Sequence, residues 1–190
     1  MKQLYIIAGC NGAGKTTASY TILPEILSCK EFVNADEIAR GLSPFQAEKA
    51  AIEAGKIMLE RIDELLNKRI SFAFETTMAT KSFSKTITRA HEAGYSVSIL
   101  FFWLQTVDLA KQRVKKRVEE GGHNIDEDVI ERRYTSGIKN LFKIYFPIAD
   151  TVLIFDNSEG KHELIFKKTN QDEIAVLNKD KYEQLKTESL

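Results

Sequence analysis

The sequence has few of the residues that build disulfides and metal centres. Among its 190 residues are only two cysteines, Cys10 and Cys29, and three histidines, His91, His123 and His162. The cysteines form neither a metal-binding spacing nor a redox motif, and the histidines are too scattered to form a metal cluster. The sequence therefore predicts no metal centre of cysteine and histidine, and each histidine is expected to be a surface or hydrogen-bonded residue.

An excess of one charge and long hydrophobic runs are also missing. The 27 lysines and arginines balance 27 acidic residues, and a net charge of zero removes the usual bulk electrostatic argument for nucleic-acid binding. The longest apolar run, residues 97–104, is far too short to span a bilayer. Because a strand-like segment opens the chain, we expect no signal peptide and a location in the reducing cytoplasm. One globular domain is expected for this length and ordinary composition.

The segment from Gly9 to Thr16 matches the phosphate-binding pattern Gly-x4-Gly-Lys-Ser/Thr at every required position. An apolar run precedes it at residues 4–8, and a helix-compatible stretch follows at residues 15–27. A strand, a glycine loop and a helix in this order are what a nucleotide triphosphate site requires. The dinucleotide-binding pattern Gly-x-Gly-x-x-Gly fails here, because Thr17 stands where its third glycine would be.

Each residue type in this loop suits phosphate binding. Glycines allow backbone angles that a Cβ would forbid, so successive N–H groups can form an anion-binding nest at the positive end of the following helix. We expect Lys15 to bring its charge to the outer phosphates, Thr16 to hold Mg²⁺ and Thr17 to support the inner phosphates. The predicted nucleotide contacts are Gly9, Asn11, Gly12, Ala13, Gly14, Lys15, Thr16 and Thr17.

Five apolar runs alternate with helical segments along the first 156 residues. Strands are expected at residues 4–8, 32–34, 70–74, 97–104 and 151–155. These runs are continuous rather than alternating, which is typical of buried parallel strands. The pattern predicts an α/β fold with a doubly wound, five-stranded parallel sheet and helices on both faces.

Capping and breaker residues predict the helix limits. The segment from Ser43 to Gln46 looks like a capping box with proline at the first helical position, and its helix is expected to run to about Lys68. Further helices are expected at about 81–93, 106–122 and 126–147. The predicted organisation is a core over residues 1–158, which includes a lid at about 113–134. Residues 159–190 are expected to add an edge strand at 163–167 and a surface helix, packed on the same domain.

Polar residues follow the predicted strands at the edge where open α/β sheets bind ligands. Asp36 follows the second strand and is our candidate to accept a hydroxyl proton, although an aspartate here could instead cap the next helix. Glu75 follows the third strand, where an unpaired carboxylate is costly and needs a cation or hydroxyl partner. Thr77 either donates to substrate oxygens or is an ordinary strand-end residue. The segment 156–158 could line the adenine end, but we favour a simple turn.

Two helical segments with several arginines meet at Gly121 and Gly122, and this is the outline of a mobile lid over transferring phosphates. Arg117 and Arg133 are the preferred catalytic cations, with Arg113 and Arg132 in reserve. The alternative is that these arginines pair on the surface with acidic neighbours three or four residues away, namely Glu119, Glu120 and Glu131.

With these residues collected, the sequence resembles the zeta toxin family of P-loop kinases. The matching segments are 9–17, 32–36, 74–77 and 113–134, which extend over most of residues 1–158. The resemblance implies a fold like that of shikimate- and adenylate-type kinases, ATP and Mg²⁺ as cofactors, UDP-N-acetylglucosamine as the phosphoryl acceptor and an antitoxin partner. It further implies that Lys15 binds phosphate, Thr16 holds Mg²⁺, Asp36 is the general base, Glu75 and Thr77 lie at the sugar site, and Arg117 is the first lid arginine.

One departure from the family pattern concerns the second lid arginine. This chain has His123 where the toxins have that arginine, and Arg132 and Arg133 lie inside the following helix instead. The segment 121–123 is similar to a non-toxin, uncharacterised branch of the family, so the nucleotide sugar remains a hypothesis.

The sequence thus predicts an ATP- and Mg²⁺-dependent kinase that phosphorylates a hydroxyl of a small molecule. A nucleotide-switched binding module is the alternative, although no glutamine is placed to position a hydrolytic water. A nucleic acid end kinase would need a basic groove, which the net charge does not suggest.

Overall fold

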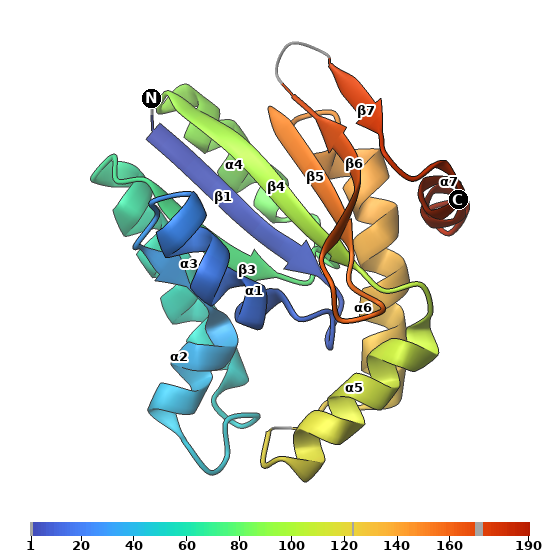
Figure 1. Ribbon diagram of the computed structural model, residues 1–190. Helices are drawn as coiled ribbons and strands as arrows, with labels where there is room; N and C mark the ends of the chain where they lie inside the picture. Colours follow the sequence, from blue (N-terminus) through green and yellow to red (C-terminus); the bar gives the residue numbers. More distant parts are fainter. Residues whose placement is uncertain (1, 123, 170–172) are drawn as a thin grey trace.

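The computed structural model describes residues 2–122, 124–169 and 173–190 and contains one seven-stranded sheet with the order β2-β3-β1-β4-β5-β6-β7 (Figure 1). The strands are β1 (Lys2–Gly9), β2 (Phe32–Val33), β3 (Phe72–Thr76), β4 (Tyr95–Trp103), β5 (Thr151–Asp156), β6 (Glu163–Lys168) and β7 (Ile174–Val176). The helices are α1 (Lys15–Thr21), α2 (Ala35–Leu42), α3 (Ala51–Asn67), α4 (Phe83–Glu92), α5 (Val107–Glu119), α6 (Glu127–Asn140) and α7 (Lys179–Thr187). Short π-helical segments, Ile22–Ile26 and Leu141–Tyr145, continue α1 and α6.

The first five strands form the predicted parallel sheet. All pairings among β2, β3, β1, β4 and β5 are parallel. Helices cover both faces, with α1 in front of the sheet and α4 and α6 behind it in Figure 1. The side chains of β1 and β4 are almost all buried, which explains their continuous apolar sequence. The α/β class and the doubly wound arrangement are confirmed.

Two antiparallel strands extend the sheet beyond β5. The predicted edge strand, β6, pairs with β5 on one side and with β7 on the other, so the prediction that it forms the edge is wrong. All three side chains of β7 are exposed. A strand whose side chains bury no apolar face has no periodic signal in the sequence, which is why β7 was not predicted.

The expected capping box at Ser43 is also wrong. α2 ends at Leu42, residues 44–50 form successive turns, and α3 begins at Ala51. The Ser43 carbonyl accepts a hydrogen bond from the Gln46 N–H in the first of these turns. Phe45 is 97% exposed, so no packing draws this segment into a helix. Local capping chemistry therefore has no apolar face to support it before α3 begins.

The third strand lies two residues later than expected. β3 starts at Phe72 rather than at Ile70, which is 37% exposed, and it continues through Glu75 and Thr76. The register pairs Glu75 with Ile7 of β1. Glu75 is therefore held by the sheet itself, directly beside the strand that leads into the glycine loop.

Helix α6 lies very close to the segment that follows β3. A Cβ atom built on Gly137 of α6 would stand 2.6 Å from the Thr77 carbonyl oxygen. Three residues later, the Asn140 Nδ2 donates to the carbonyl oxygens of Met78 and Ala79 at 3.0 and 2.9 Å. The small residue at 137 lets the helix approach this backbone, and Asn140 holds it there.

Within the described ranges, every helix is too short or too polar to span a bilayer.

Two glycines inside helices, Gly137 and Gly55, give a matched test of the contact between α6 and the segment after β3. We expect Gly137→Ala to lower the free energy of unfolding by about 1–3 kcal/mol, because the new methyl group overlaps backbone that cannot move freely. Gly55→Ala in α3, where an added Cβ meets nothing within 4 Å, should raise it by about 0.5–1 kcal/mol. Urea unfolding measures both changes. Equal effects at the two positions would contradict the close approach of α6.

Candidate functional site

The glycine loop follows β1 and opens α1. Gly9, Gly12 and Gly14 have φ angles of 139°, 80° and 80°, which side chains with a Cβ rarely adopt. A Cβ on Gly9 would also lie 2.2 Å from the Phe102 carbonyl oxygen of β4. Gly14 directly precedes the first residue of α1, so the loop ends at a helix N-terminus. This is the strand, loop and helix arrangement that binds polyphosphates through backbone N–H groups.

Four polar side chains meet beneath this loop. The Lys15 Nζ donates to the Cys10 carbonyl oxygen at 3.0 Å and lies 3.5 Å from Glu75 Oε1. The Thr16 hydroxyl donates to Glu75 Oε2 at 2.8 Å, and the Asn34 Nδ2 donates to the same oxygen at 3.0 Å. The side chains of Lys15 and Glu75 are only 7% and 9% exposed. The carboxylate that the sequence predicted to need a partner therefore has three.

This cluster offers oxygen ligands suited to a hard cation. The Thr16 hydroxyl and the Glu75 carboxylate are adjacent oxygen donors next to the phosphate loop. Among the described residues, no group of three or more His, Cys, Asp and Glu side chains is arranged to hold a metal ion. Mg²⁺ usually binds through one or two protein oxygens, waters and substrate phosphates, so the residues present fit that ion.

Asp36 does not cap helix α2. The Asn34 side-chain oxygen is the cap, and it accepts from the Asp36 and Glu37 N–H groups at 2.8 and 3.4 Å. The capping alternative for Asp36 is therefore excluded. The Asp36 side chain is exposed in the first turn of α2, and it lines the cleft beside the loop.

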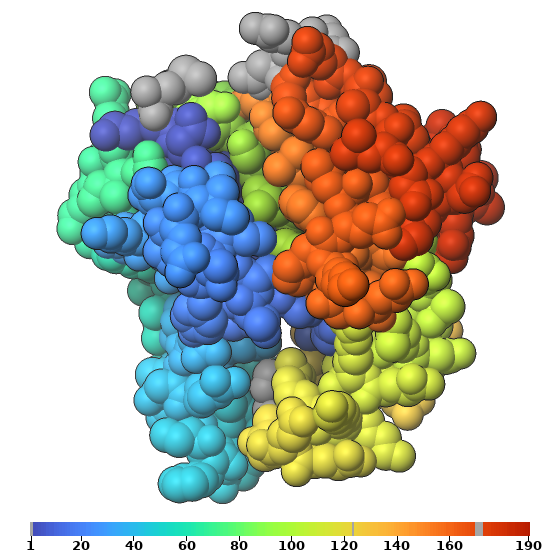
Figure 2. All heavy atoms as spheres, in the orientation of Figure 1, coloured from blue at the N-terminus to red at the C-terminus, as the bar shows by residue number. Residues whose placement is uncertain are grey.

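That cleft has a volume of about 1160 Å³ and lies between the α2–α3 side and the α5–α6 side. Figure 2 shows the molecule hollowed here, between the cyan end of α2 and the yellow end of α5. Asp36, Arg117 and Arg133 all line it, so the structure brings these three predicted residues together. The predicted hinge glycines, Gly121 and Gly122, line it too, whereas His123 lies outside the described residues.

Arg133 joins the cleft to the phosphate loop. Its Nη1 donates to the Asn11 side-chain oxygen of the loop at 3.2 Å. Burial lowers the pKa of Arg133 below its usual range, while the nearby charge of Asp36 opposes that shift. A guanidinium remains charged after such a shift. The neighbouring Arg132 is exposed and, unlike Arg133, is not among the described residues that line the cleft.

Other predicted residues lie elsewhere. Thr77 follows β3 beneath Gly137 and is not among the described residues that line the cleft. Thr17 is exposed on α1. Arg113 is not among the described residues that line the cleft, and it donates to the Gly12 carbonyl oxygen and to the turn after β5.

Sequence reasoning missed two asparagines at this site. Asn34 directly follows β2, so its position after a strand was a usable signal, but the prediction assigned the functional role to Asp36, two residues later. Asn157 donates from Nδ2 to the Ala13 carbonyl oxygen at 2.8 Å. That contact joins residues 144 positions apart, and nothing local in the sequence indicates it. The segment 156–158 does form the favoured turn, but the turn also touches the loop.

Comparisons with known proteins agree with this fold. The family model described as "Zeta toxin" matches residues 1–181. An uncharacterised protein of Haemophilus influenzae is 29% identical over 126 residues, which are 66% of this chain and 88% of that protein.

Solved structures with low sequence identity share the fold. A chain of the AvrRxo1-ORF1:AvrRxo1-ORF2 complex with sulphate ions has a TM-score of 0.80 at 16% identity, and a structure of this complex with ATP scores 0.78. Our chain is covered completely but spans only 65% of that longer chain. The PezAT chromosomal toxin–antitoxin system of Streptococcus pneumoniae gives a TM-score of 0.68 at 17% identity, covering 98% of our chain and 84% of its own.

The thiol inside the loop should be inert. Burial raises the pKa of Cys10 to about 11, although the charge of Lys15 lowers it in part. At pH 8 we expect iodoacetamide to modify Cys10 about a hundredfold more slowly than a free thiol, because so little thiolate is present. Peptide mass spectrometry against time measures this rate, with guanidinium-unfolded protein as the control. Modification of the folded protein at the unfolded rate would show that Cys10 is not buried as described.

Proposed function

Because this chain belongs to the zeta toxin family, we propose that it is an ATP-dependent phosphotransferase whose acceptor is a hydroxyl group of a small molecule. The observation that supports this most directly is the position of Asp36 and Arg133 on one cleft, with Arg133 also bonded to Asn11 of the phosphate loop. A carboxylate and a cation thus face a single space next to the loop. Phosphoryl transfer needs both groups at that place.

The phosphate loop supplies the nucleotide end of this reaction. Its N–H groups and the ammonium of Lys15 would bind the β- and γ-phosphates of ATP. The Lys15 ammonium lies 3.5 Å from Glu75, so the charge that would bind phosphate is held beneath the loop. Thr16 and Glu75 would hold Mg²⁺ directly or through water, and the ion would offset the charge of the phosphates.

The cleft supplies the acceptor end. Asp36 would orient the acceptor hydroxyl and accept its proton as the new oxygen–phosphorus bond forms. Arg133 and Arg117 would stabilise the charge on the transferring phosphoryl group. We infer that α5, the connection after it and the start of α6 act as a lid that keeps water out of this reaction.

We propose a nucleotide sugar, with UDP-N-acetylglucosamine as the first candidate, as the acceptor. Support comes from the family, and from a cleft volume of about 1160 Å³ that would admit a ligand of this size. Glu75 and Thr77 were expected at the sugar, but Glu75 lies with Lys15 beneath the loop, so its proposed role moves to the metal. The cleft lining mixes Arg40, Arg117 and Arg133 with four acidic residues, which favours a small polar ligand over a nucleic acid end.

A protein partner and a cytoplasmic location complete the proposal. Structural neighbours come from a toxin–antitoxin system and from a two-component complex, which supports an antitoxin-like partner for this chain. ATP and nucleotide sugars would both be available in the cytoplasm.

The role of Asp36 has a matched control on the same helix. With ATP and a panel of sugars and nucleotide sugars, we expect Asp36→Asn to lower kcat by about 10²- to 10⁴-fold, because the proton acceptor is lost. Glu37→Gln removes a neighbouring carboxylate that is not among the described residues lining the cleft, and it should change turnover less than about twofold. Liquid chromatography with mass spectrometry of the products measures both. Unchanged turnover in Asp36→Asn would remove Asp36 from this role, and ATP hydrolysis independent of any acceptor would favour a nucleotide-switched module.

The two adjacent arginines provide a second matched pair. We expect Arg133→Ala to reduce kcat by about 10²- to 10³-fold, since a cation facing the moving phosphoryl group is removed. Arg132→Ala, which changes an exposed side chain on the same turn of α6, should reduce it less than about twofold. Steady-state kinetics with saturating ATP separates the two. Similar losses at both positions would mean that Arg133 has no special relation to the transferred group.

A further inference from the structure

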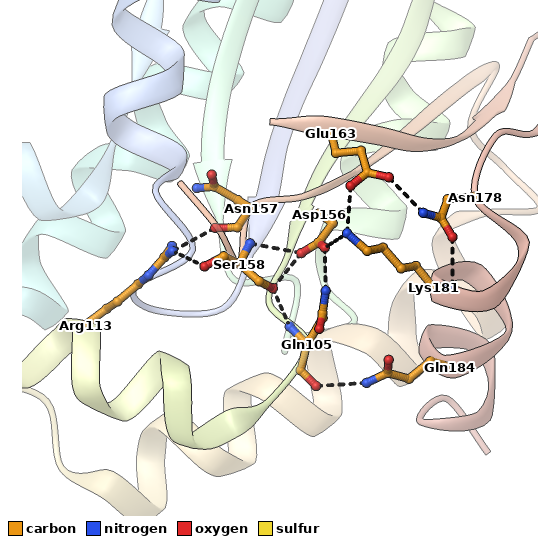
Figure 3. Close-up of polar contacts among 9 residues, drawn as sticks. All are labelled: Gln105, Arg113, Asp156, Asn157, Ser158, Glu163, Asn178, Lys181 and Gln184. Atoms are coloured by element: carbon orange, nitrogen blue, oxygen red, sulfur yellow. Dashed lines mark hydrogen bonds and ion pairs between the residues drawn. The ribbon is translucent and has the colours of Figure 1, made fainter. Parts of the chain in front are cut away.

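A buried carboxylate lies at the end of β5, outside the catalytic cleft. Asp156 is 2% exposed, and its Oδ2 accepts from the Gln105 Nε2 at 2.7 Å and from the Lys181 Nζ at 2.6 Å (Figure 3). Lys181 belongs to α7 and also pairs with Glu163 of β6 at 2.7 Å. A helix near the C-terminus thus supplies the cation for a buried anion at the end of β5.

Lys181 is one of several hydrogen-bond donors that favour the charged form of Asp156. Burial raises the pKa of Asp156, but hydrogen bonds from Lys181, Ser158 and Gln105 outweigh burial and leave it below its usual range. Lys181 shows the complementary effect, since hydrogen bonds to Asp156 and Glu163 raise its pKa. A buried carboxylate without its cation is strongly disfavoured. Loss of Lys181 should therefore disturb the turn at residues 156–158, which Asp156 holds in place.

Asp156 holds the turn that follows it. Its Oδ1 accepts from both the N–H and the hydroxyl of Ser158, at 2.9 and 2.5 Å. The Ser158 hydroxyl in turn accepts from the Gln105 N–H at 2.9 Å. The Asp156 carboxylate therefore links residue 156 to residue 158, and it fixes the backbone conformation of Asn157, which lies between them.

The turn touches the phosphate loop at consecutive residues. Asn157 Nδ2 donates to the Ala13 carbonyl oxygen at 2.8 Å, and it would lie 2.5 Å from a Cβ on Gly14. Arg113 donates through Nη2 to the carbonyl oxygens of Asn157 and Ser158 at 2.8 and 2.9 Å, and through Nη1 to Gly12 at 3.4 Å. A continuous set of contacts thus runs from α7 to residues 12–14 of the loop.

We propose that Lys181 is a positioning residue of the nucleotide site, acting through Asp156 and the 156–158 turn on the shape of the phosphate loop. This inference rests on the proposed function, since it takes ATP as the ligand of the loop. Lys181 itself need not touch the nucleotide. Asp36 and Arg133, which are proposed to carry the transfer step, lie in the cleft and outside this set of contacts. Loss of Lys181 should therefore weaken phosphate binding rather than slow the transfer step.

Isothermal titration calorimetry and steady-state kinetics on the full chain test the inference. We expect Lys181→Met to raise the Kd and KM for Mg²⁺–ATP about tenfold, the cost of one charge-assisted contact, with kcat at saturating ATP within about twofold of wild type. Inorganic tripolyphosphate should lose affinity in parallel, because it shares the phosphates and lacks the base. Lys181→Arg should restore most of the affinity. Lys186→Met on the same helix, at an exposed lysine that forms no ion pair with the described residues, is the control.

The outcomes separate this inference from the proposed function. If wild type binds no ATP, the proposed function fails and the inference fails with it. If wild type binds ATP and Lys181→Met binds it equally well, or loses ATP affinity while keeping that for tripolyphosphate, the inference alone is overturned. Should Lys181→Met not fold, the double variant Asp156→Asn with Lys181→Met removes both charges together. Weaker ATP binding by that folded variant supports the inference, and wild-type binding overturns it.

Discussion

The contact between Lys15 and Glu75 is the interaction on which the site depends. Parallel pairing of β1 with β3 places the carboxylate beside the start of the loop, and the loop returns the ammonium to it. A buried pair of this kind gains little net stability unless every polar atom is satisfied. Here the Cys10 carbonyl, Thr16 and Asn34 complete it. Even with these hydrogen bonds, the Coulomb attraction of a buried pair does little more than offset the cost of desolvation. We therefore infer that the main role of this pair is to hold the Lys15 ammonium where a phosphate would bind.

Helix α6 contacts the phosphate loop, the C-terminal segment and the segment after β3, because residues along it face in different directions. Arg133 points to the loop and the cleft, whereas the next residue, Tyr134, is buried and donates to Glu188 near the C-terminus at 2.8 Å. Further along, Gly137 and Asn140 fix the segment after β3. Arg113 similarly ties the first half of α5 to the loop. Any movement of the proposed lid should therefore involve the end of α5 rather than its first half.

The parts that could be predicted from sequence are those specified locally. The loop requires particular residues within eight consecutive positions, and the buried parallel strands require continuous apolar runs, so both were identified. Even Glu75 was recognised, because a carboxylate at the end of a buried strand needs a partner. The break at Ser43 was missed because nothing packs on Phe45, and β7 was missed because it buries no side chain. The contact of Asn157 with Ala13 depends on the assembled sheet, which no local pattern encodes.

The C-terminal segment is more than an appendage to the nucleotide-binding core. Its Lys181 neutralises Asp156, and its Glu188 accepts hydrogen bonds from Trp103 and Tyr134 inside the protein. A minimal version ending at residue 158 would keep the residues of the loop and the cleft, but it would leave Asp156 without Lys181, and Trp103 and Tyr134 without Glu188. Over evolutionary time, positions 156 and 181 should therefore change together, and tails from related proteins should not be interchangeable without their matching partners.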